Sequence, residues 1–422
     1  MERYSEYKAS SIQWLEELPS HWEERKVKYS FIERSEKNHP NEPILCATQS
    51  QGVIPQSLYQ NRVVVVNKGF EGLKFVRVGD FVISLRSFEG GIEYAYYQGI
   101  ISAAYTIIKP FNKENTEYFK LLFKSHPFIQ LLQTCVTGIR EGQNINYQLL
   151  GRKFIPIPPL AEQEKIVKFL ESKTSNIDAY VAERERELRL LNELKESEIA
   201  NVITHGLNPN VKMKDSRIPW LKSIPIHWSE ERAKYLFIRE NRAISETDEI
   251  ITCFRDGQVT LRKNRRTTGF TESFKECGYQ GIRKGDLVIH QMDAFAGAVG
   301  ISDSDGKGTP VYIVCTPKRS DVYNPYFALV IREMGLNGYI QSLYRGIRER
   351  SSDFKFDVFR QQYLPLPPIE EQETIVALIE ERSNRVISLI NELQAEIEYL
   401  KEYKQSLIAD CVTGQINVQN EL

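Results

Sequence analysis

The sequence has few of the features that mark a membrane, secreted or metal-binding protein. No run of about 18 apolar residues occurs, which argues against a membrane-spanning helix. The first residues, MERYSEYKAS, lack the basic and apolar regions of a signal peptide. Its six cysteines are far apart and form no C-x-x-C pair, so neither a zinc ribbon nor a disulfide framework is indicated. We therefore expect a cytoplasmic protein with free thiols.

Motifs of catalysis are also missing. There is no G-x-x-x-x-G-K-[ST] phosphate loop and no H-E-x-x-H metal site among the six histidines. A DNA methyltransferase needs a glycine-rich cofactor loop and an aromatic-Pro-Pro tetrapeptide that holds a flipped base. The segment Asn324-Pro325-Tyr326-Phe327 has a single proline in a helix-start context. These absences predict a chain that is not an enzyme and binds no metal or cofactor itself.

Length and composition indicate a soluble chain of two domains. The chain has 422 residues, of which 41% are hydrophobic and 26% charged, as is usual for globular proteins. Its net charge of -1 hides an uneven distribution, because the stretch 255–266 is basic whereas the segment after Leu160 is rich in Glu. Binding to phosphate depends on where charge lies and not on its sum. The neutral total therefore does not exclude a nucleic-acid partner.

The chain repeats itself. WLEELPSHWEERKVKYSFI begins at Trp14 and WLKSIPIHWSEERAKYLFI begins at Trp220, an offset of 206 residues. The offset holds through VRVGDFVI and IRKGDLVI, becomes 208 at the two GIRE segments, and is 209 at IPIPPLAEQEKIV and LPLPPIEEQETIV. Such self-similarity over the whole length indicates one unit encoded twice.

Each copy begins with short strands and turns. Alternating and β-branched segments bounded by Gly and Asp predict strands at 59–67, 80–85 and 103–110 in the first copy and at 286–291 and 311–317 in the second. In the second copy, we expect Asn324 to cap a helix with Pro325 at its first position. Each copy thus predicts a mixed, mostly β globule of about 150 residues.

Each copy ends in a long helix. Pro158-Pro159 and Pro367-Pro368 stop a strand, acids fill the first turn that follows, and about 45 residues without Pro or Gly come next. Apolar residues in these stretches are spaced by 3, 4 and 7, the pattern of a coiled-coil seam. These seam positions are Ile166, Leu170, Ile177, Val181, Leu188 and Leu191 in the first helix, and Ile375, Ile379, Val386, Ile390, Leu393, Ile397, Leu400 and Leu407 in the second. The two helices are expected to pack together as a rigid spacer.

These motifs together resemble the specificity subunit of type I restriction-modification systems. W-x-x-x-x-P-x-H-W, G-D-x-V-I and I-P-x-P-P-x-x-E-Q-E-x-I-V (with Leu in place of the first Ile in the second copy) occur twice in the same order. The resemblance covers essentially the whole chain. It implies an α+β fold of two mixed, mainly β target recognition domains joined by two long antiparallel coiled-coil helices with pseudo-twofold symmetry. The implied division is a first recognition domain at 1–157, a helix at 158–205, a second recognition domain at 206–366, a helix at 367–413 and a tail at 414–422.

The resemblance also implies a function and partners. Each domain would read one half of a bipartite, asymmetric site on double-stranded DNA, while the helices set the spacing and dock two modification subunits. Those subunits would methylate adenine with S-adenosylmethionine, and restriction subunits would add ATP-driven cleavage with magnesium. Two other functions stay open: a protein-binding coiled-coil scaffold without DNA affinity, and a fused enzyme with an unrecognised active site.

Candidate DNA contacts are polar residues in loops that differ between the copies, since two different half-sites need different readers. One such loop is 48–52 in the first copy and 255–258 in the second, where it continues to Arg266, and the other follows the G-D-x-V-I strand; they include Ser84, Asp256 and Asp293. The GIRE segments suit either a phosphate contact or an ion pair with their own Glu. The candidates are Gln49, Ser50, Gln51, Arg86, Ser87, Arg140, Gln143, Asn144, Arg255, Gln258, Arg262, Lys263, Arg265, Arg266, His290, Gln291, Arg348 and Arg350.

Residues that recur in both copies cannot distinguish two half-sites. Tryptophan and histidine recur near each start, and we expect them in the core or at a helix-docking surface. These are Trp14, His21, Trp22, Trp220, His227 and Trp228. The Glu-rich outer faces of the helices would repel phosphate and are expected to be solvated.

Overall fold

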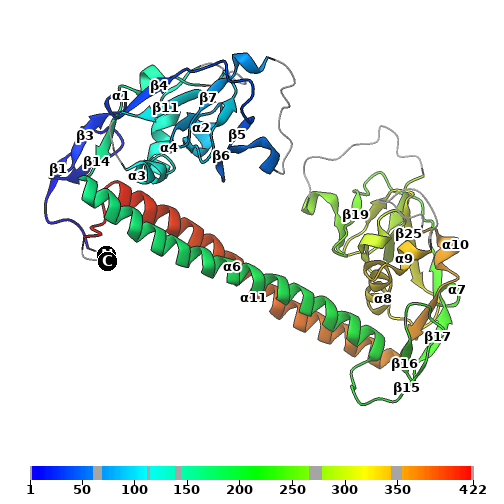
Figure 1. The fold of residues 1–422 in the computed structure, drawn as a ribbon. Coiled ribbons are helices and arrows are strands. Elements are labelled where there is room, and N and C mark those ends of the chain that lie inside the picture. Colours follow the sequence, from blue (N-terminus) through cyan, green and yellow to red (C-terminus); the bar gives the residue numbers. More distant parts are fainter. Residues whose placement is uncertain are drawn as a thin grey trace. The chain divides into compact units, whose positions relative to one another are not determined.

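The computed structural model describes residues 2–59, 69–111, 115–137, 144–265, 278–343 and 354–419. The chain forms two compact units, of which unit 1 is Met1–Arg186 with Leu393–Leu422 and unit 2 is Glu187–Glu392. The boundary between the units falls inside both long helices, α6 (Leu160–His205) and α11 (Ile369–Val412) (Figure 1). Each unit therefore combines one globule with parts of both helices.

A four-stranded antiparallel sheet forms the centre of each globule. In unit 1 the order is β4 (Phe31–Arg34), β11 (Thr106–Pro110), β8 (Phe81–Ile83) and β9 (Glu93–Tyr94). In unit 2 the same order is formed by β18 (Phe237–Arg239), β25 (Tyr312–Pro317), β22 (Leu287–His290) and β23 (Val299–Ile301). Four of the five strand segments expected from sequence are confirmed here. The fifth, 59–67, lies outside the described residues except for Tyr59.

Two-stranded antiparallel ribbons surround each sheet. In unit 1 they are β1 (Tyr7–Ala9) with β2 (Glu17–Pro19), β3 (Glu23–Lys26) with β14 (Phe154–Ile157), β5 (Leu45–Thr48) with β6 (Gly52–Pro55), β7 (Lys74–Val76) with β10 (Gly99–Ile101), and β12 (Val136–Thr137) with β13 (Asn144–Ile145). In unit 2 they are β15 (Met213–Asp215) with β16 (Ser223–Pro225), β17 (Ser229–Arg232) with β26 (Tyr363–Leu366), β19 (Ile251–Cys253) with β20 (Val259–Leu261), and β21 (Gln280–Ile282) with β24 (Gly306–Gly308).

Short helices complete the globules. Unit 1 has α1 (Val27–Ser30), α2 (Ser87–Gly90), α3 (Thr116–Leu122), α4 (His126–Gln133), α5 (Tyr147–Leu150), η1 (Gln56–Leu58) and η2 (Phe70–Gly72). Unit 2 has α7 (Ala233–Leu236), α8 (Asn324–Leu336), α9 (Tyr339–Ser342), α10 (Phe356–Phe359), η4 (Arg262–Asn264) and η5 (Ala294–Ala296). Within the described ranges, no helix is long and apolar enough to cross a membrane.

Aromatic side chains fill the space between the sheet and the helices. In unit 1 the rings of Phe31 and Phe119 lie 5.0 Å apart in an edge-to-face arrangement, and in unit 2 Phe237 and Phe327 lie 5.3 Å apart. All four side chains are buried. Each buried phenylalanine stabilises its globule by roughly 1.5 to 3 kcal/mol, so these pairs anchor α3 and α8 firmly on their sheets.

The prediction that Asn324 caps α8 is wrong. The helix begins at Asn324 and is capped by Tyr323, with Pro325 in the first turn and no side-chain hydrogen bond to the cap. The Asn324 amide instead donates to the carbonyl of Gly285, 3.0 Å away, while Gln372 Oε1 accepts the Tyr323 N–H at 2.9 Å. Asn324 therefore fixes α8 to the turn before β22, and Gln372 of α11 fixes the residue that precedes the helix.

The long helices pair antiparallel in each unit. In unit 1, Lys404 of α11 contacts Asp178 of α6 at 2.6 Å, and Glu396 of α11 lies 3.7 Å from Arg184 of α6. The residue numbers fall along one helix as they rise along the other, so the two helices are antiparallel. In unit 2, Arg382 lies 3.9 Å from Glu198. Exposed ion pairs contribute only about 0 to 1 kcal/mol each, so the buried seam stabilises the pair. The seam expected from sequence is confirmed, because its residues are buried or half-buried throughout.

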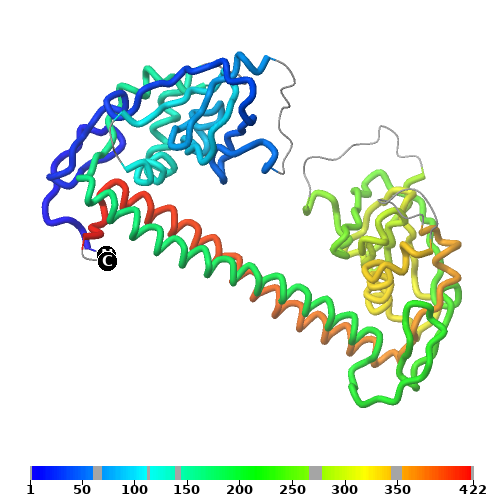
Figure 2. Tube along the Cα trace, in the orientation of Figure 1, coloured from blue at the N-terminus to red at the C-terminus, as the bar shows by residue number. Residues whose placement is uncertain are grey.

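Each globule holds the start of one helix and the end of the other. The buried Tyr118 hydroxyl donates to the carbonyl of Val412 at 2.8 Å, and Tyr326 donates to the carbonyl of Ile203 at 2.9 Å. Figure 2 shows the first residues of the chain beside the end of α11 in unit 1, where the Tyr7 hydroxyl donates to the Gly414 carbonyl. The same docking by equivalent residues in both units follows from the duplicated sequence.

The recurring histidines and tryptophans belong to this docking surface. His21 lies 2.8 Å from Glu162 in the first turn of α6, and His227 lies 2.8 Å from Glu371 in the first turn of α11. Trp22 and Trp228 are buried in the two cores. Their expected role in the core or in helix docking is confirmed.

Candidate nucleic-acid interface

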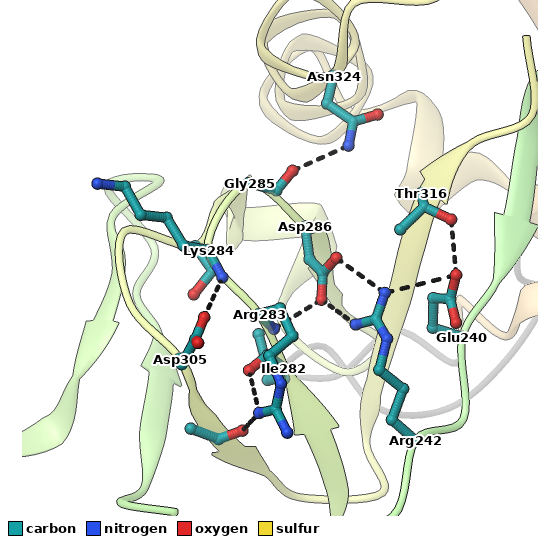
Figure 3. A network of polar contacts seen from close by, with 12 residues as sticks. Glu240, Arg242, Ile282, Arg283, Lys284, Gly285, Asp286, Asp305, Thr316 and Asn324 are labelled. Carbon is teal, nitrogen blue, oxygen red and sulfur yellow. Dashed lines mark hydrogen bonds and ion pairs between the residues drawn. The ribbon is translucent and has the colours of Figure 1, made fainter.

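The repeated G-D-x-V-I motif builds a rigid turn before the central strand of each sheet. In unit 2, Asp286 accepts the backbone N–H of Arg283 at 2.7 Å, and its carboxylate pairs with the guanidinium of Arg242 (Figure 3). In unit 1, Asp80 accepts the Arg77 N–H at 2.8 Å and lies 3.0 Å from Arg34. Burial raises the pKa of Asp80 despite these partners. Both aspartates are buried, so the motif is a structural support for the loop that follows β8 and β22.

In unit 1, the two candidate loops lie next to each other. Gln49, Ser50 and Gln51 form the exposed tip of the β5–β6 hairpin, which Thr48 closes by accepting the Gln51 N–H at 3.0 Å. The Gln49 side chain lies against Gly90 at the end of α2, because a Cβ atom on Gly90 would be 2.8 Å from Gln49 Cγ. Arg86, exposed just before α2, belongs to the same surface. Segments almost 40 positions apart in the sequence thus form one polar surface.

Tyrosines beside this hairpin were missed from sequence. The rings of Tyr94 and Tyr96 lie 4.9 Å apart edge to face, and the Lys120 ammonium lies 4.8 Å from the centre of each ring. Tyr96 and its neighbour Tyr97 are exposed. The equivalent segment of unit 2, Ile301 to Ser304, has no aromatic residue. The signal was the cluster of three tyrosines in EYAYYQ, present in only one copy.

In unit 2, an ion pair joins the two candidate loops. Arg255, at the tip of the β19–β20 hairpin, donates to Asp293 in the loop after β22 at 2.8 Å. Gln258 is exposed on the same hairpin tip. The Arg255 side chain is 63% exposed, so its guanidinium lies at the surface.

Two further basic residues close to this hairpin, Lys263 and Arg265, are also held by acids. Lys263 lies 2.5 Å from Glu249, and Arg265 lies 2.6 Å from Asp256. The Arg265 guanidinium also lies 4.3 Å from the centre of the Phe254 ring. Arg262 is half-buried, with Nε 3.4 Å from the Thr252 hydroxyl. The cations are therefore oriented before any ligand is present, and their charge is largely balanced.

His290 and Gln291 are less accessible than the sequence suggested. The His290 ring is half-buried against Tyr312, and its Nδ1 accepts the Asp293 N–H at 3.2 Å. Burial lowers the pKa of His290. The Gln291 carbonyl accepts the N–H of Phe354 at 3.1 Å, and its side chain lies 3.3 Å from the Pro310 carbonyl. Both residues therefore stabilise the loop after β22 through contacts beneath its exposed surface.

The other candidates are buried or half-buried, or they lie outside the described residues. Ser87 is buried, and its hydroxyl accepts the Ser84 N–H at 2.8 Å, so it shapes the turn after β8 without reaching the surface. Asn144 is half-buried on β13, which contacts α2. The candidates outside the described residues are Arg140, Gln143, Arg266, Arg348 and Arg350. Among the described residues, no group of three or more His, Cys, Asp or Glu is placed to hold a metal ion.

A buried carboxylate beneath the unit 1 loops should make this unit sensitive to pH. Burial raises the pKa of Glu93 to about 7, and the Lys124 ammonium 2.5 Å away only partly opposes the shift. The pKa of Glu93 is higher in the folded chain than in the unfolded chain. The free energy of unfolding is therefore highest while Glu93 is neutral, below about pH 4.5, and it decreases as pH rises through 7. Between pH 5 and 8, wild type should lose up to roughly 3 kcal/mol of unfolding free energy relative to Glu93→Gln. Amide hydrogen exchange of residues 69–111 measures this loss.

Glu89→Gln is the control for that prediction, because Glu89 is an exposed acid on α2. It should retain the pH dependence of wild type. The predicted cause is wrong if Glu93→Gln shows the same pH dependence as wild type.

Comparisons with known proteins agree with this architecture. Residues 19–188 match the family model of the type I restriction modification DNA specificity domain. The specificity subunit of the type I restriction enzyme EcoBI from Escherichia coli is 21% identical over 299 residues, which cover 66% of this chain and 61% of that protein. The match thus spans about three fifths of that relative's length.

Two solved structures have the same fold. A chain from a study of complex assembly and conformational transition of the type I R-M system superposes with a TM-score of 0.67 at 16% identity, over 94% of this chain and 99% of that chain. The HsdS subunit from Thermoanaerobacter tengcongensis superposes with a TM-score of 0.53 at 16% identity, over 94% and 98%. These likenesses confirm the α+β fold class. With the matched domain over residues 19–188 and the repeated motifs, the comparisons show that this chain is similar to type I restriction-modification specificity subunits.

Proposed function

We propose that this chain is the DNA-reading subunit of a type I restriction-modification complex and that each globule contacts one half of a bipartite, asymmetric target. The observation that carries the proposal is that the two units share one framework but have unlike exposed loops. The G-D turn, the buried tyrosines and the helix docking recur in both units. The hairpin tips and the loops after β8 and β22 do not. Two readers of different half-sites need this combination.

The chemistry of the loops favours DNA over a protein partner. Glutamine pairs with adenine and arginine with guanine in the major groove, while lysine and arginine also neutralise phosphates. Unit 1 presents Gln49, Gln51 and Arg86, and unit 2 presents Arg255, Lys263 and Arg265. The proposed interface is therefore amide-rich and aromatic in one unit, and rich in arginine and lysine that are paired with acids in the other.

We further propose that the chain itself is not catalytic. In the assembled complex, modification subunits would methylate adenine with S-adenosylmethionine, and restriction subunits would use ATP and magnesium for cleavage. Support comes from the family and from the missing motifs of catalysis. Helices of 46 and 44 residues, about 1.5 Å per residue, suit the proposed role of setting the spacing between half-sites. A cytoplasmic location stays a prediction.

Exposed apolar pairs on the long helices are the proposed docking sites for two modification subunits. Tyr399 and Tyr403 on α11 are 67% and 41% exposed, and Leu190 and Leu194 on α6 are 53% and 52% exposed. Each pair lies one turn apart on one helix face, and the pairs are equivalent at an offset of 209. Because each unit has one such pair, the arrangement favours two copies of the same kind of partner, one bound at each pair.

A gel-shift titration at several salt concentrations tests DNA reading. The proposal predicts binding whose affinity falls steeply as salt rises, because neutralised phosphates release counterions. A protein-binding scaffold predicts no DNA affinity at any salt concentration. Absence of binding by the chain together with its modification subunits would exclude the proposed function.

The acids that pair with the basic hairpin should limit non-specific binding. Replacing Asp256 by Asn and Glu249 by Gln leaves Arg265 and Lys263 without their partners, so affinity for random duplex DNA should rise roughly 3- to 10-fold at low salt. Fluorescence anisotropy with a random duplex measures this effect. Asp321→Asn removes an acid that is 41% exposed and pairs with Arg319 outside the candidate loops, and it should change nothing. An unchanged affinity in the double variant would show that Asp256 and Glu249 do not weaken the attraction of Arg265 and Lys263 to phosphate.

A further inference from the structure

One cation in unit 1 connects both loops of the proposed interface from below. Lys124 lies between α3 and α4, and its Nζ donates to the carbonyl of Gln49 at 3.1 Å and to the carbonyl of Gly90 at 2.8 Å. The third hydrogen of the ammonium is directed to Glu93, 2.5 Å away. Gln49 belongs to the hairpin tip, and Gly90 ends α2 in the loop after β8. All three donors of the lysine are therefore used, and two of them fix the backbone of the loops.

A different cation makes the same connection in unit 2. Arg332, on α8, donates through Nη1 to the carbonyl of Arg255 and to the carbonyl of Gly297, both at 2.6 Å. Arg255 belongs to the hairpin tip, and Gly297 directly follows η5 in the loop after β22. A Cβ atom on Gly257 or on Gly297 would lie 3.0 Å from the same Nη1, so the backbone closes tightly around the guanidinium.

The two cations occupy equivalent positions. Tyr118-Phe119 and Tyr326-Phe327 align at an offset of 208, which also places Lys124 opposite Arg332. The hairpin residues whose carbonyls they bind, Gln49 and Arg255, align at an offset of 206. The side chains at the loop surface differ between the units, whereas the contact of a cation with two loop carbonyls is kept.

We propose that Lys124 and Arg332 are positioning residues that join the hairpin tip and the loop after the central strand into one reading surface, and that each thereby sets specificity at one half-site. This inference rests on the proposed function. Base readout needs donors and acceptors held within about 0.5 Å of their partners, and independent loops would have to be ordered on every binding event. The contacts to carbonyl oxygens act on the backbone, so neither side chain needs to touch DNA.

The two units provide matched controls for each other. Lys124→Met and Arg332→Met keep the aliphatic stem and remove the donors. With the complex of this chain and its modification subunits, the preferred target is first selected from random DNA. Binding is then measured to that target and to duplexes with single base-pair changes in either half. Lys124→Met should lower the discrimination between correct and changed bases about 10-fold or more in one half only, and Arg332→Met should do so only in the other half.

Conservative variants separate positioning from stability. Lys124→Arg and Arg332→Lys keep a donor near the same carbonyls and should retain most of the discrimination that the methionine variants lose. The salt dependence of binding to random DNA should stay at the wild-type value in all four variants, because phosphate contacts do not change. If a methionine variant does not fold, the conservative variant of the same residue still tests the claim, since its discrimination should stay within a few-fold of wild type.

Four outcomes would overturn the inference. Unchanged discrimination in both methionine variants would show that the contacts are irrelevant to reading. Equal loss in both halves from one substitution would indicate general destabilisation, as would loss in the conservative variants. A wild-type complex that selects no two-part sequence would overturn the proposed function and this inference with it, whereas selection by wild type with unaffected variants overturns the positioning role alone.

Discussion

Replacing Arg255, Lys263 and Arg265 together by alanine is expected to reduce affinity for the target about 100-fold or more near 0.1 M salt. These side chains carry three positive charges on one exposed hairpin of unit 2, where ion pairs with acids hold them in place. The slope of log affinity against log salt should fall by roughly 2 to 3, about 0.9 for each lost phosphate contact. Fluorescence anisotropy over a salt series measures both effects. Assembly with modification subunits should be unaffected.

A charge-matched variant of the same unit controls for this prediction. Lys284, Lys318 and Arg319 are exposed basic residues outside the candidate loops. Their joint replacement by alanine removes the same charge and should leave target affinity within a few-fold of wild type. Equal losses in both triple variants would mean that net charge, and not this hairpin, determines binding.

Replacing Tyr399 and Tyr403 by glutamine should reduce the number of bound modification subunits from two to one. Two aromatic anchors buried at an interface contribute on the order of 2 to 4 kcal/mol, or about 30- to 1000-fold in affinity. Glutamine is a good helix former and both positions are exposed, so α11 should fold as before. Native mass spectrometry or analytical ultracentrifugation of the purified complex counts the bound subunits.

The equivalent pair on α6 provides the matched variant. Leu190→Gln with Leu194→Gln should remove the other subunit, and the four substitutions together should remove both. Binding of the free chain to DNA should persist in every case. Two subunits still bound to the fourfold variant would mean that the partner docks elsewhere.

Features that depend on one stretch of sequence were predictable. The duplication, the heptad spacing from Ile166 onward and the Pro-Pro boundaries determined two globules and two long helices, and the structure has the helices at Leu160–His205 and Ile369–Val412. The central strands followed from alternating and β-branched segments. Helix docking by His21 and His227 followed from their recurrence in both copies. Each of these inferences uses local pattern or repetition alone.

Features that depend on contacts between distant segments were not predictable. The Asn324 amide donates to the carbonyl of Gly285, 39 positions away, and the helix is capped by Tyr323, so the assignment of a cap to Asn324 failed. Burial of Ser87 depends on how the turn after β8 folds back. The contact of Lys124 with the Gln49 carbonyl joins residues 75 positions apart, and neither residue type nor spacing indicates it. Loop chemistry could therefore be proposed from sequence, but the way in which the loops are joined could not.

Selection of random-sequence DNA by the complex of this chain with its modification subunits tests the central claim most directly. We expect enriched sequences with two unlike short motifs separated by a fixed number of unspecified base pairs. Replacing residues 1–157 with the corresponding domain of a relative should then change one motif and keep the other. Enrichment of one continuous motif, of two motifs at variable separation, or of no sequence at all would contradict it.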